Sequence, residues 1–168
     1  DRDFIKIILN KCKNYIVGYL VIDPLPNYLE KFKNENKKIK YLKLKLYRYC
    51  VSGGNKKVNF FINSDPTTSS YYKANHKLLN LIRDDRRFDK KKIIKIKTLN
   101  LKKIFKKHSI NNVDLLTLCT QGSELDIIKG LGKQLRNISL IRAHKDWVNK
   151  YDNELACQPF NRSCCYFA

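Results

Sequence analysis

Apolar residues near the start of the chain follow first a helical and then a strand-like spacing. Between residues 4 and 13 they recur three and four positions apart, which predicts a helix with lysines on its other side. Residues 16–22 form an almost continuous apolar run rich in β-branched and aromatic side chains, which predicts a strand covered on both faces. This strand is expected to end at Asp23.

A second helix is predicted directly after Asp23. Proline is tolerated in the first turn of a helix, so Pro24 and Pro26 favour a helix start at this point. The buried face of that helix, at spacings of four and three, consists of Leu25, Leu29 and Phe32.

The pattern changes to period two from residue 39, with leucine at positions 42, 44 and 46 and lysine or tyrosine at 43, 45 and 47. A strand with lysines along one face is half-solvated and suits the edge of a sheet, where charge also discourages pairing with other chains. A turn at residues 52–55 and a short strand at 58–62 follow, so this region predicts a hairpin.

The middle of the chain predicts shorter elements. Residues 64–70 are polar and contain a proline, which predicts a loop that could lie over a site. A helical turn at 78–82 and a solvated, charged connector at 83–92 precede an alternating strand at 93–98. A short helix then ends near His108, and its buried side consists of Leu101, Ile104 and Phe105.

Residues 113–143 predict a strand, a tight turn, a helix and a second strand. The first strand covers 113–119, the polar corner 120–122, the helix 123–135 and the last strand 138–143. The apolar stripe of the helix consists of Leu125, Ile128, Leu131 and Leu135. Ser123 with Asp126 three residues later is a variant of the capping arrangement at a helix start.

Strands that alternate with helices predict an α/β fold, a parallel sheet with helices on both faces. Ligands of such sheets bind beyond the carboxyl ends of the strands. In this chain those ends are Asp23, residues 50–52, residues 119–122 and His144.

Length, composition and charge indicate the number of domains and the kind of partner. A chain of 168 residues, 43% hydrophobic, is long enough for one compact domain. Its 35 Lys and Arg against 15 Asp and Glu give a net charge of +20, which would attract a polyanion such as nucleic acid. The many lysines also occur among Asn and Ile, as the amino-acid bias of an AT-rich genome would produce for any function.

The cysteines and the termini suggest a compartment. The six cysteines show no CxxC spacing, so we expect no zinc site and mainly buried thiols rather than disulfides, in the cytoplasm or another reducing compartment. No apolar run is long enough for a bilayer span and no signal peptide is visible, so we expect a soluble protein with no membrane partner. A chain without methionine is expected to have lost its initiator or to be part of a longer protein.

The run from Val113 to Leu131 resembles the hallmark of FkbM-type methyltransferases. It consists of an apolar strand, the segment Gln121-Gly122-Ser123-Glu124, an apolar helix and Lys-Gly. The resemblance covers roughly residues 4–145. It implies a Rossmann-like class I sheet and methyl transfer from S-adenosylmethionine to an oxygen of a sugar or other small-molecule acceptor. The family's first strand and glycine-rich loop do not precede Phe4, so we expect this sheet to lack its first strand.

The resemblance also assigns roles to residues. Asp23 would accept hydrogen bonds from the cofactor's ribose hydroxyls, with a helix cap as the alternative. Cys50, Val51 and Ser52 would lie near the adenine. His144 would act as general base, while Gln121 and Glu124 would orient the acceptor; alternatively, Glu124 caps its own helix and His144 is a polar strand end.

Cys119 stands where the family usually has an acid, and a core thiol is expected there rather than a nucleophile. A cysteine does not replace a carboxylate as a magnesium ligand, so no metal site is expected. The domain is expected to cover residues 1–147, followed by an irregular tail over 148–168.

Two other functions stay open at this point. One is a non-catalytic structural or binding protein on a decayed methyltransferase fold, such as a component of a larger viral or cellular particle. The other is a basic module that binds nucleic acid.

Overall fold

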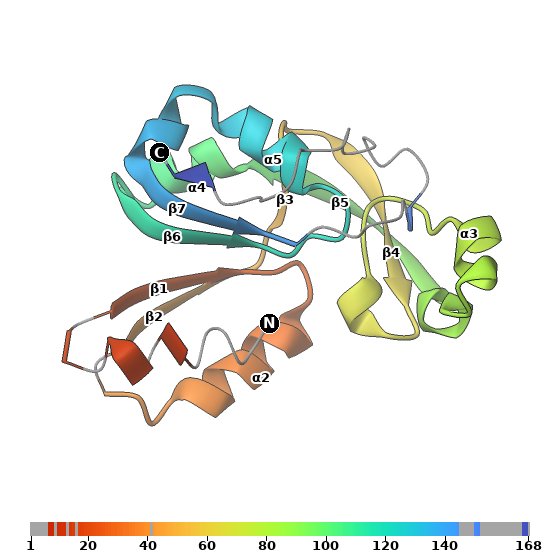
Figure 1. The fold of residues 1–168 in the computed structure, drawn as a ribbon, viewed down its shortest axis with the longest axis horizontal. Coiled ribbons are helices and arrows are strands. Elements are labelled where there is room, and N and C mark those ends of the chain that lie inside the picture. The colour runs from red at the N-terminus through yellow and green to blue at the C-terminus, as the bar shows by residue number, and fades with distance from the viewer. Residues whose placement is uncertain are drawn as a thin grey trace. The chain divides into compact units, whose positions relative to one another are not determined.

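The computed structural model describes residues 7–8, 10–12, 14–15, 17–40, 42–144, 150–151 and 166–167. The chain forms two compact units, residues 1–50 and 51–168, and each is described here by itself (Figure 1). Both combine helices with strands, so the predicted α/β class is confirmed.

The first unit contains a strand–helix–strand motif. Strand β1 (Val17–Ile22) pairs in parallel with β2 (Leu42–Tyr47), and helix α2 (Pro26–Asn36) connects them. Pro26 lies in the first turn of α2, as predicted. Leu29 and Phe32 are buried, and the Phe32 ring lies 5.4 Å from the Tyr19 ring, so the predicted apolar face of the helix is confirmed.

Two predictions for this unit need correction. Residues 19–22 are half-buried rather than covered on both faces, because β1 is one of only two strands described in its sheet. The lysines of β2 are exposed, as expected at a sheet edge, but the predicted hairpin is wrong, since β2 pairs with β1 and not with residues 58–62. Of the helix predicted over residues 4–13, positions 7, 8, 10 and 11 are helical and most of the rest lie outside the described residues.

The second unit begins with a three-stranded sheet in the order β3 (Cys50–Ser52), β5 (Lys90–Asn100), β4 (Lys57–Asn63). β4 and β5 are antiparallel, and the ladder shifts register between Ile62 and Asn63. The turn after Ser52 therefore connects two strands that both flank β5. β5 starts inside the region predicted as a connector. The prediction missed this start because the lysines of β5 alternate with half-buried residues only from Lys95 onward.

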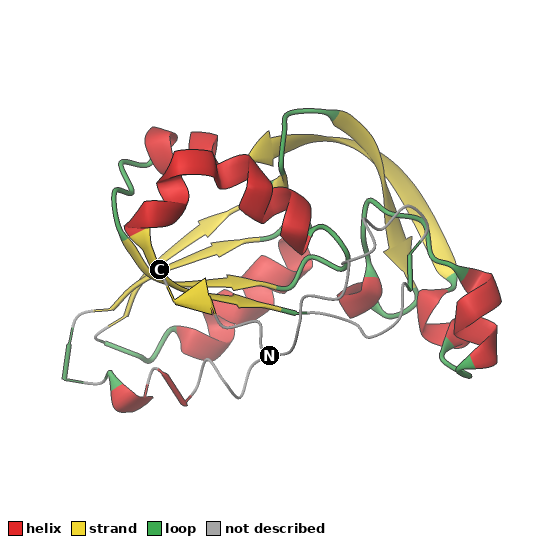
Figure 2. Ribbon diagram, turned by 45° about the horizontal axis from the view of Figure 1, so that its top comes forward, coloured by secondary structure: helices red, strands yellow, loops and turns green. Residues whose placement is uncertain are grey.

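The other sheet of this unit has parallel strands β6 (Val113–Leu118) and β7 (Ile138–Ala143), with β8 (Tyr166–Phe167) antiparallel to β7. Helices α4 (Leu101–Lys107) and α5 (Glu124–Leu131) and the 3-10 helix η3 (Gly132–Asn137) lie on one side of β6 and β7 (Figure 2). The buried side chains between these elements are Leu101, Ile104, Phe105, Leu118, Ile127, Leu131, Ile138 and Ile141.

Helix α5 is shorter than predicted. It ends at Leu131 because Gly132 adopts a left-handed φ of +54°, and residues 132–137 continue as a 3-10 helix. Its buried apolar residues are Ile127 and Leu131, whereas Leu125, Ile128 and Leu135 are only half-buried.

A smaller core forms around helix α3 (His76–Leu81) and the 3-10 helices η1 (Pro66–Thr68) and η2 (Asp85–Phe88). It contains Ala74, Leu79, Phe88 and Tyr151. Tyr151 bridges to Ala74, and its ring lies 5.7 Å from that of Phe88. Of the tail predicted over 148–168, the described residues include Tyr151, which belongs to this core, and β8, which pairs with β7. Among the described residues, no helix combines the length and the apolar character that a membrane crossing requires.

Candidate active site

The corner between β6 and α5 is built by Glu124. The Glu124 side chain is buried, and its two carboxylate oxygens accept hydrogen bonds from the backbone N–H groups of Thr120 (2.5 Å) and Gly122 (2.9 Å). Gln121 and Gly122 between them have φ of +57° and +101°. Both values lie in the left-handed region, so the carboxylate holds a conformation that a residue such as Gln121 seldom adopts.

The predicted cap of α5 is wrong in its details. Ser123 precedes the helix but makes no capping bond to it; its hydroxyl lies 2.8 Å from Oγ1 of Thr120. Asp126 also points elsewhere, as described below. Glu124 satisfies backbone donors of the corner that precedes α5 rather than donors of the helix itself.

Gln121 is held from two directions. Its backbone oxygen accepts a hydrogen bond from Oγ of Ser70 (2.7 Å). The hydroxyl of Tyr151 donates to the backbone oxygen of Thr68 (2.8 Å) and lies 3.3 Å from Oε1 of Gln121. The loop at 64–70 thus contacts the corner, consistent with a loop that lies over a site.

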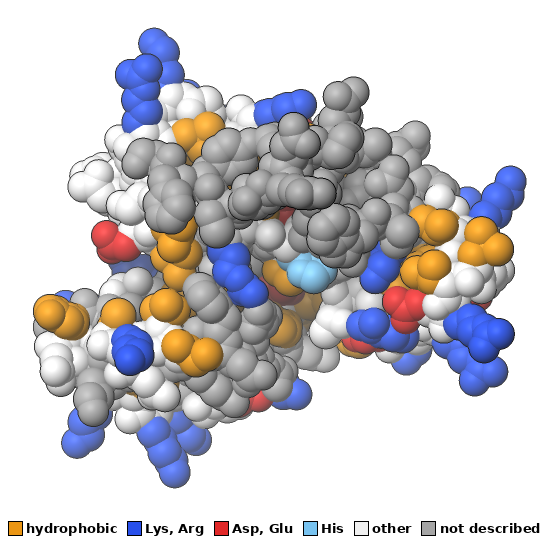
Figure 3. All heavy atoms as spheres, in the orientation of Figure 1, with side chains coloured by type: hydrophobic (Ala, Val, Ile, Leu, Met, Phe, Trp, Pro, Cys, Tyr) orange, Lys and Arg blue, Asp and Glu red, His pale blue; other side chains and the backbone are white. Residues whose placement is uncertain are grey.

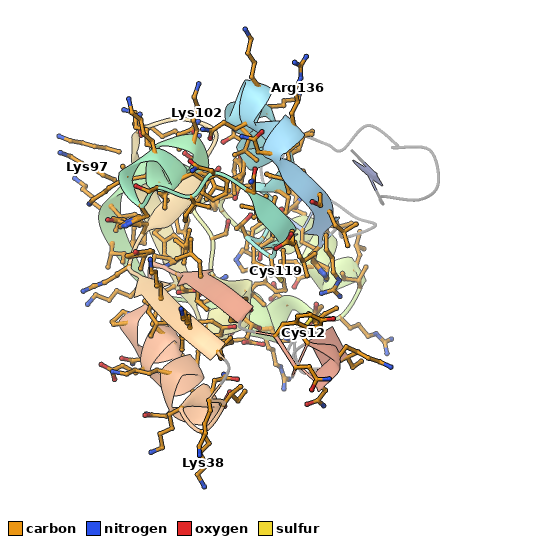
Figure 4. The ribbon with its side chains drawn as sticks, turned by 90° about the vertical axis from the view of Figure 1, so that its left-hand side faces the viewer. Cys12, Lys38, Lys97, Lys102, Cys119 and Arg136 are labelled. Carbon is orange, nitrogen blue, oxygen red and sulfur yellow. The ribbon has the colours of Figure 1, made fainter. Side chains whose placement is uncertain are left out.

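Cys119 and His144 follow adjacent parallel strands. Leu118 and Ala143 are partners at the ends of β6 and β7, and the backbone N–H of His144 donates to the oxygen of Leu118 (2.8 Å). Both side chains are exposed (Figure 4 labels Cys119). The expected burial of Cys119 is wrong, because β6 ends one residue before it.

Of the other described cysteines, Cys50 is buried and Cys12 is half-buried. Cys157, Cys164 and Cys165 lie outside the described residues. Within the described part of the chain, no three His, Cys, Asp or Glu residues come together to hold a metal ion.

Asp126 connects α5 to the turn after β3. Its Oδ2 accepts hydrogen bonds from the backbone N–H of Gly53 (2.8 Å) and the hydroxyl of Tyr71 (3.2 Å), and Lys56 lies 3.7 Å away. Burial strongly raises the pKa of Tyr71, so its phenol stays protonated and donates. Asn100 completes the junction by donating from Nδ2 to the backbone oxygens of Gly53 and Gly130.

Cys50, Val51 and Ser52, which the resemblance places near the adenine, lie in β3 directly before this turn, and the Ser52 hydroxyl is already hydrogen-bonded there. Ser52 is fully buried, and its hydroxyl lies 2.8 Å from Oγ1 of Thr98 and 2.7 Å from the backbone oxygen of Gly54. Cys50 is buried and Val51 is half-buried. These three residues form β3 itself rather than the end of β2, which is at Tyr47.

Asp23 lies in the first unit, directly after β1. Its Oδ1 accepts a hydrogen bond from the backbone N–H of Leu25 (2.7 Å), the N-cap residue of α2. Burial raises the pKa of Asp23 to about 6, and the hydrogen bond from Leu25 partly opposes that rise. Asp23 therefore shapes the turn into α2 with one carboxylate oxygen.

Several residues of the corner were missed by the sequence analysis. Tyr71 and Tyr151 come from segments without regular periodicity, and no motif marks them, whereas Ser70 lies in the predicted loop at 64–70. The sequence predicted Gly53 only as part of a turn. In the structure its backbone N–H donates to Asp126, so it belongs to the junction between α5 and the turn.

Comparison with known proteins decides the family. A family model described as the methyltransferase FkbM domain matches residues 4–156. The chain belongs to the FkbM methyltransferase family. No curated protein and no solved structure matches it. The FkbM match includes the corner at 119–124, His144, Tyr151 and Asp23, so the resemblance read from Gln121-Gly-Ser-Glu124 is confirmed.

Proposed function

We propose that this FkbM-family chain transfers a methyl group from S-adenosylmethionine to an oxygen atom of a sugar or another small molecule. The observation that carries the proposal is the corner at the carboxyl end of β6, where Glu124 fixes Thr120 and Gly122 and leaves Cys119 and His144 exposed beside it. In parallel α/β sheets this edge is where ligands bind.

Asp23 fits the ribose end of the cofactor. Its Oδ1 is bonded to Leu25, and its Oδ2 can accept from a ribose hydroxyl. Burial strengthens such a bond, because fewer water molecules compete for the carboxylate. This support concerns the ribose end of the cofactor only.

At the acceptor end, His144 is the candidate general base. The cofactor, when bound, supplies an electrophilic methyl group, and an acceptor hydroxyl attacks it more readily as its proton leaves. A ring nitrogen of the imidazole can take that proton. Gln121 would orient the acceptor through its amide. Glu124 would act as a positioning residue, since both of its oxygens already hold backbone N–H groups.

The Rossmann-like sheet belongs to the same proposal. Within each unit a parallel pair connected through at least one helix supports it, β1–β2 in the first unit and β6–β7 in the second. The position of a first strand within that sheet stays a prediction.

Titration calorimetry with S-adenosylmethionine and with its demethylated product tests the cofactor site. We expect heat of binding for the full chain, a loss of about tenfold or more in affinity for Asp23→Asn because a charged hydrogen-bond acceptor is removed, and no change for Asp114→Asn, an exposed carboxylate on β6. The proposal would be contradicted if the chain showed no heat of binding and no protection from thermal unfolding.

The role of His144 is tested separately. His144→Gln should leave binding of the demethylated cofactor unchanged and lower methyl transfer to a panel of sugars, because the general base is removed. Unchanged transfer rates would exclude His144 as the base.

A further inference from the structure

The layer formed by α4, α5 and η3 has exposed charges of one sign only. Its exposed basic residues, called the cationic layer below, are Lys102, Lys103, Lys106, Lys107, Lys129, Lys133 and Arg136. The only acidic residues of these elements are Glu124, which is buried in the corner, and Asp126, which is half-buried and bonded to Gly53 and Tyr71. The three elements therefore contribute no exposed carboxylate of their own to this layer.

The three elements form one surface. α4 packs against α5, and α5 packs against η3. Figure 4 shows Lys102 from α4 and Arg136 from η3 both extending outward near the top of the view, and Lys97 from β5 extending outward at its left. The cationic layer is thus a continuous surface rather than lysines scattered over the fold.

Within the described residues of the second unit, a group of ion-paired acidic residues lies around η1, α3 and η2. Asp65 pairs with Arg87 (2.9 Å), Asp84 with Arg87 and Lys150 (3.6 and 3.7 Å), and Asp85 with His76 (2.6 Å). A genome-wide lysine bias would scatter lysines but would not separate them from the carboxylates. Like charges gathered on one face raise the free energy of the fold, so a partner that neutralises them would stabilise it.

The surroundings of the lysines distinguish between polyanions. Binding to an anionic membrane surface usually adds exposed apolar anchors, and binding to a single strand uses exposed aromatic rings for base stacking. Among the described residues, the large exposed apolar side chains are Ile7, Tyr15, Tyr28, Leu81, Ile82 and Ile93, none of them on this layer. The one aromatic residue of the layer, Phe105, is buried.

We propose that the cationic layer binds the phosphate backbone of duplex nucleic acid without reading its sequence. Lysine ammonium groups contact phosphates as point charges, and contacts of this kind position a duplex without specifying bases. DNA and RNA share this backbone chemistry. The inference does not depend on methyl transfer and goes beyond it.

Fluorescence anisotropy with the full 168-residue chain tests the proposal, using a labelled 20-base-pair DNA duplex, the RNA duplex of the same sequence and a thymidine 20-mer. Both duplexes should bind, the single strand more weakly, and log K should fall linearly with log salt. The layer variant K102Q/K106Q/K133Q/R136Q should reduce the slope by about 3–4, at about 0.9 per lost phosphate contact, and weaken binding by about tenfold or more.

The matched control is K31Q/K33Q/K37Q/K38Q on and after α2, which removes the same charge from exposed positions. It should change affinity by less than about threefold, since those lysines make no phosphate contact in the proposal. Equal losses in the two variants, or no duplex binding by the wild type, would overturn the proposal. Binding to phosphatidylserine vesicles without duplex binding would overturn it in favour of a membrane.

A footprint on the unmodified chain does not depend on the folding of any variant. Acetylation of lysines, mapped by mass spectrometry, should be suppressed by the duplex at Lys102, Lys103, Lys106, Lys129 and Lys133 and unchanged at Lys31 and Lys33. Uniform protection at all of these lysines would contradict a localised surface.

Discussion

The carboxyl group of Asp23 differs from most surface carboxylates because burial favours its neutral form. An ordinary aspartate ionises near 3.8, whereas Asp23 in the folded chain has a pKa of about 6. The folded state therefore holds this proton more tightly than the unfolded state does. Between these two pKa values, the free energy of unfolding falls as pH rises, and it is then level above about 6.

We predict that Asp23→Asn removes this pH dependence. The amide keeps an oxygen for the N–H of Leu25 but is never ionised, so it avoids burying a charge. In urea unfolding, the stability of the variant relative to the wild type should be greater at pH 7.5 than at pH 4.5. If the wild type has the larger free energy of unfolding at either pH, it should be at pH 4.5.

Asp65 provides a control of opposite sign. Hydrogen bonds from Thr67 and the nearby Arg87 lower the pKa of Asp65, so its contribution is present at neutral pH and lost as pH falls through the folded pKa. Asp65→Asn should therefore destabilise the chain more at pH 7.5 than at low pH. The same direction of change in both variants would contradict the assignment of burial as the cause at Asp23.

At this scale the sequence predicted residue types better than residue environments. The motif Gln121-Gly-Ser-Glu124 located the corner, but only coordinates show that Glu124 is turned back onto Thr120 and Gly122. Cys119 was misplaced because it continues the apolar run of β6, although the strand ends at Leu118 and the next side chain is exposed.

Among the elements, those with clear periodicity were predictable: β1, α2, α4, β6 and β7. Alternation shows which face of a strand is solvated, but it carries no information on which strand lies alongside, so the partner of β2 was predicted wrongly. The end of α5 was missed because an apolar stripe continues beyond Gly132, whose left-handed φ ends the helix. Tyr151 belongs to no periodic element, so its burial against Phe88 could not be predicted.

The packing of α5 against the turn after β3 depends on a glycine. A Cβ placed on Gly130 would lie 2.6 Å from Cα of Gly53 and 2.8 Å from Nδ2 of Asn100. Gly→Ala within a helix normally stabilises by about 0.5–1 kcal/mol. Here we predict that Gly130→Ala destabilises by about 1–3 kcal/mol, because backbone atoms must move apart. Urea unfolding, with the midpoint compared at constant m, measures the change.

Gly54→Ala is the matched control for Gly130→Ala. A Cβ at Gly54 meets no atom within 4 Å, although this glycine lies next to Gly53 in the same turn. We expect a change within about 0.5 kcal/mol. If Gly130→Ala were as stable as this control, the close approach of α5 to the turn would be wrong.

At the scale of the whole molecule, a net charge of +20 on 168 residues dominates the electrostatics. Lys and Arg side chains project from several parts of the face in Figure 3, with few acidic side chains among them. Mutual repulsion at this density raises the free energy of the compact state more than that of the expanded chain. Dissolved salt screens the repulsion within a Debye length, about 10 Å at 0.1 M.

Thermal stability should therefore rise with ionic strength. Between 20 and 300 mM sodium chloride we predict a Tm increase of about 2–4 °C, equivalent to about 1 kcal/mol for a chain of this size. Scanning calorimetry measures it, with choline chloride replacing sodium chloride to exclude a specific ion. The K102Q/K106Q/K133Q/R136Q variant should melt higher than the wild type at 20 mM salt and respond less to added salt, because it lacks part of the repulsion. A Tm that falls with salt in both proteins would mean that ion pairs such as Asp65–Arg87 outweigh repulsion among the lysines.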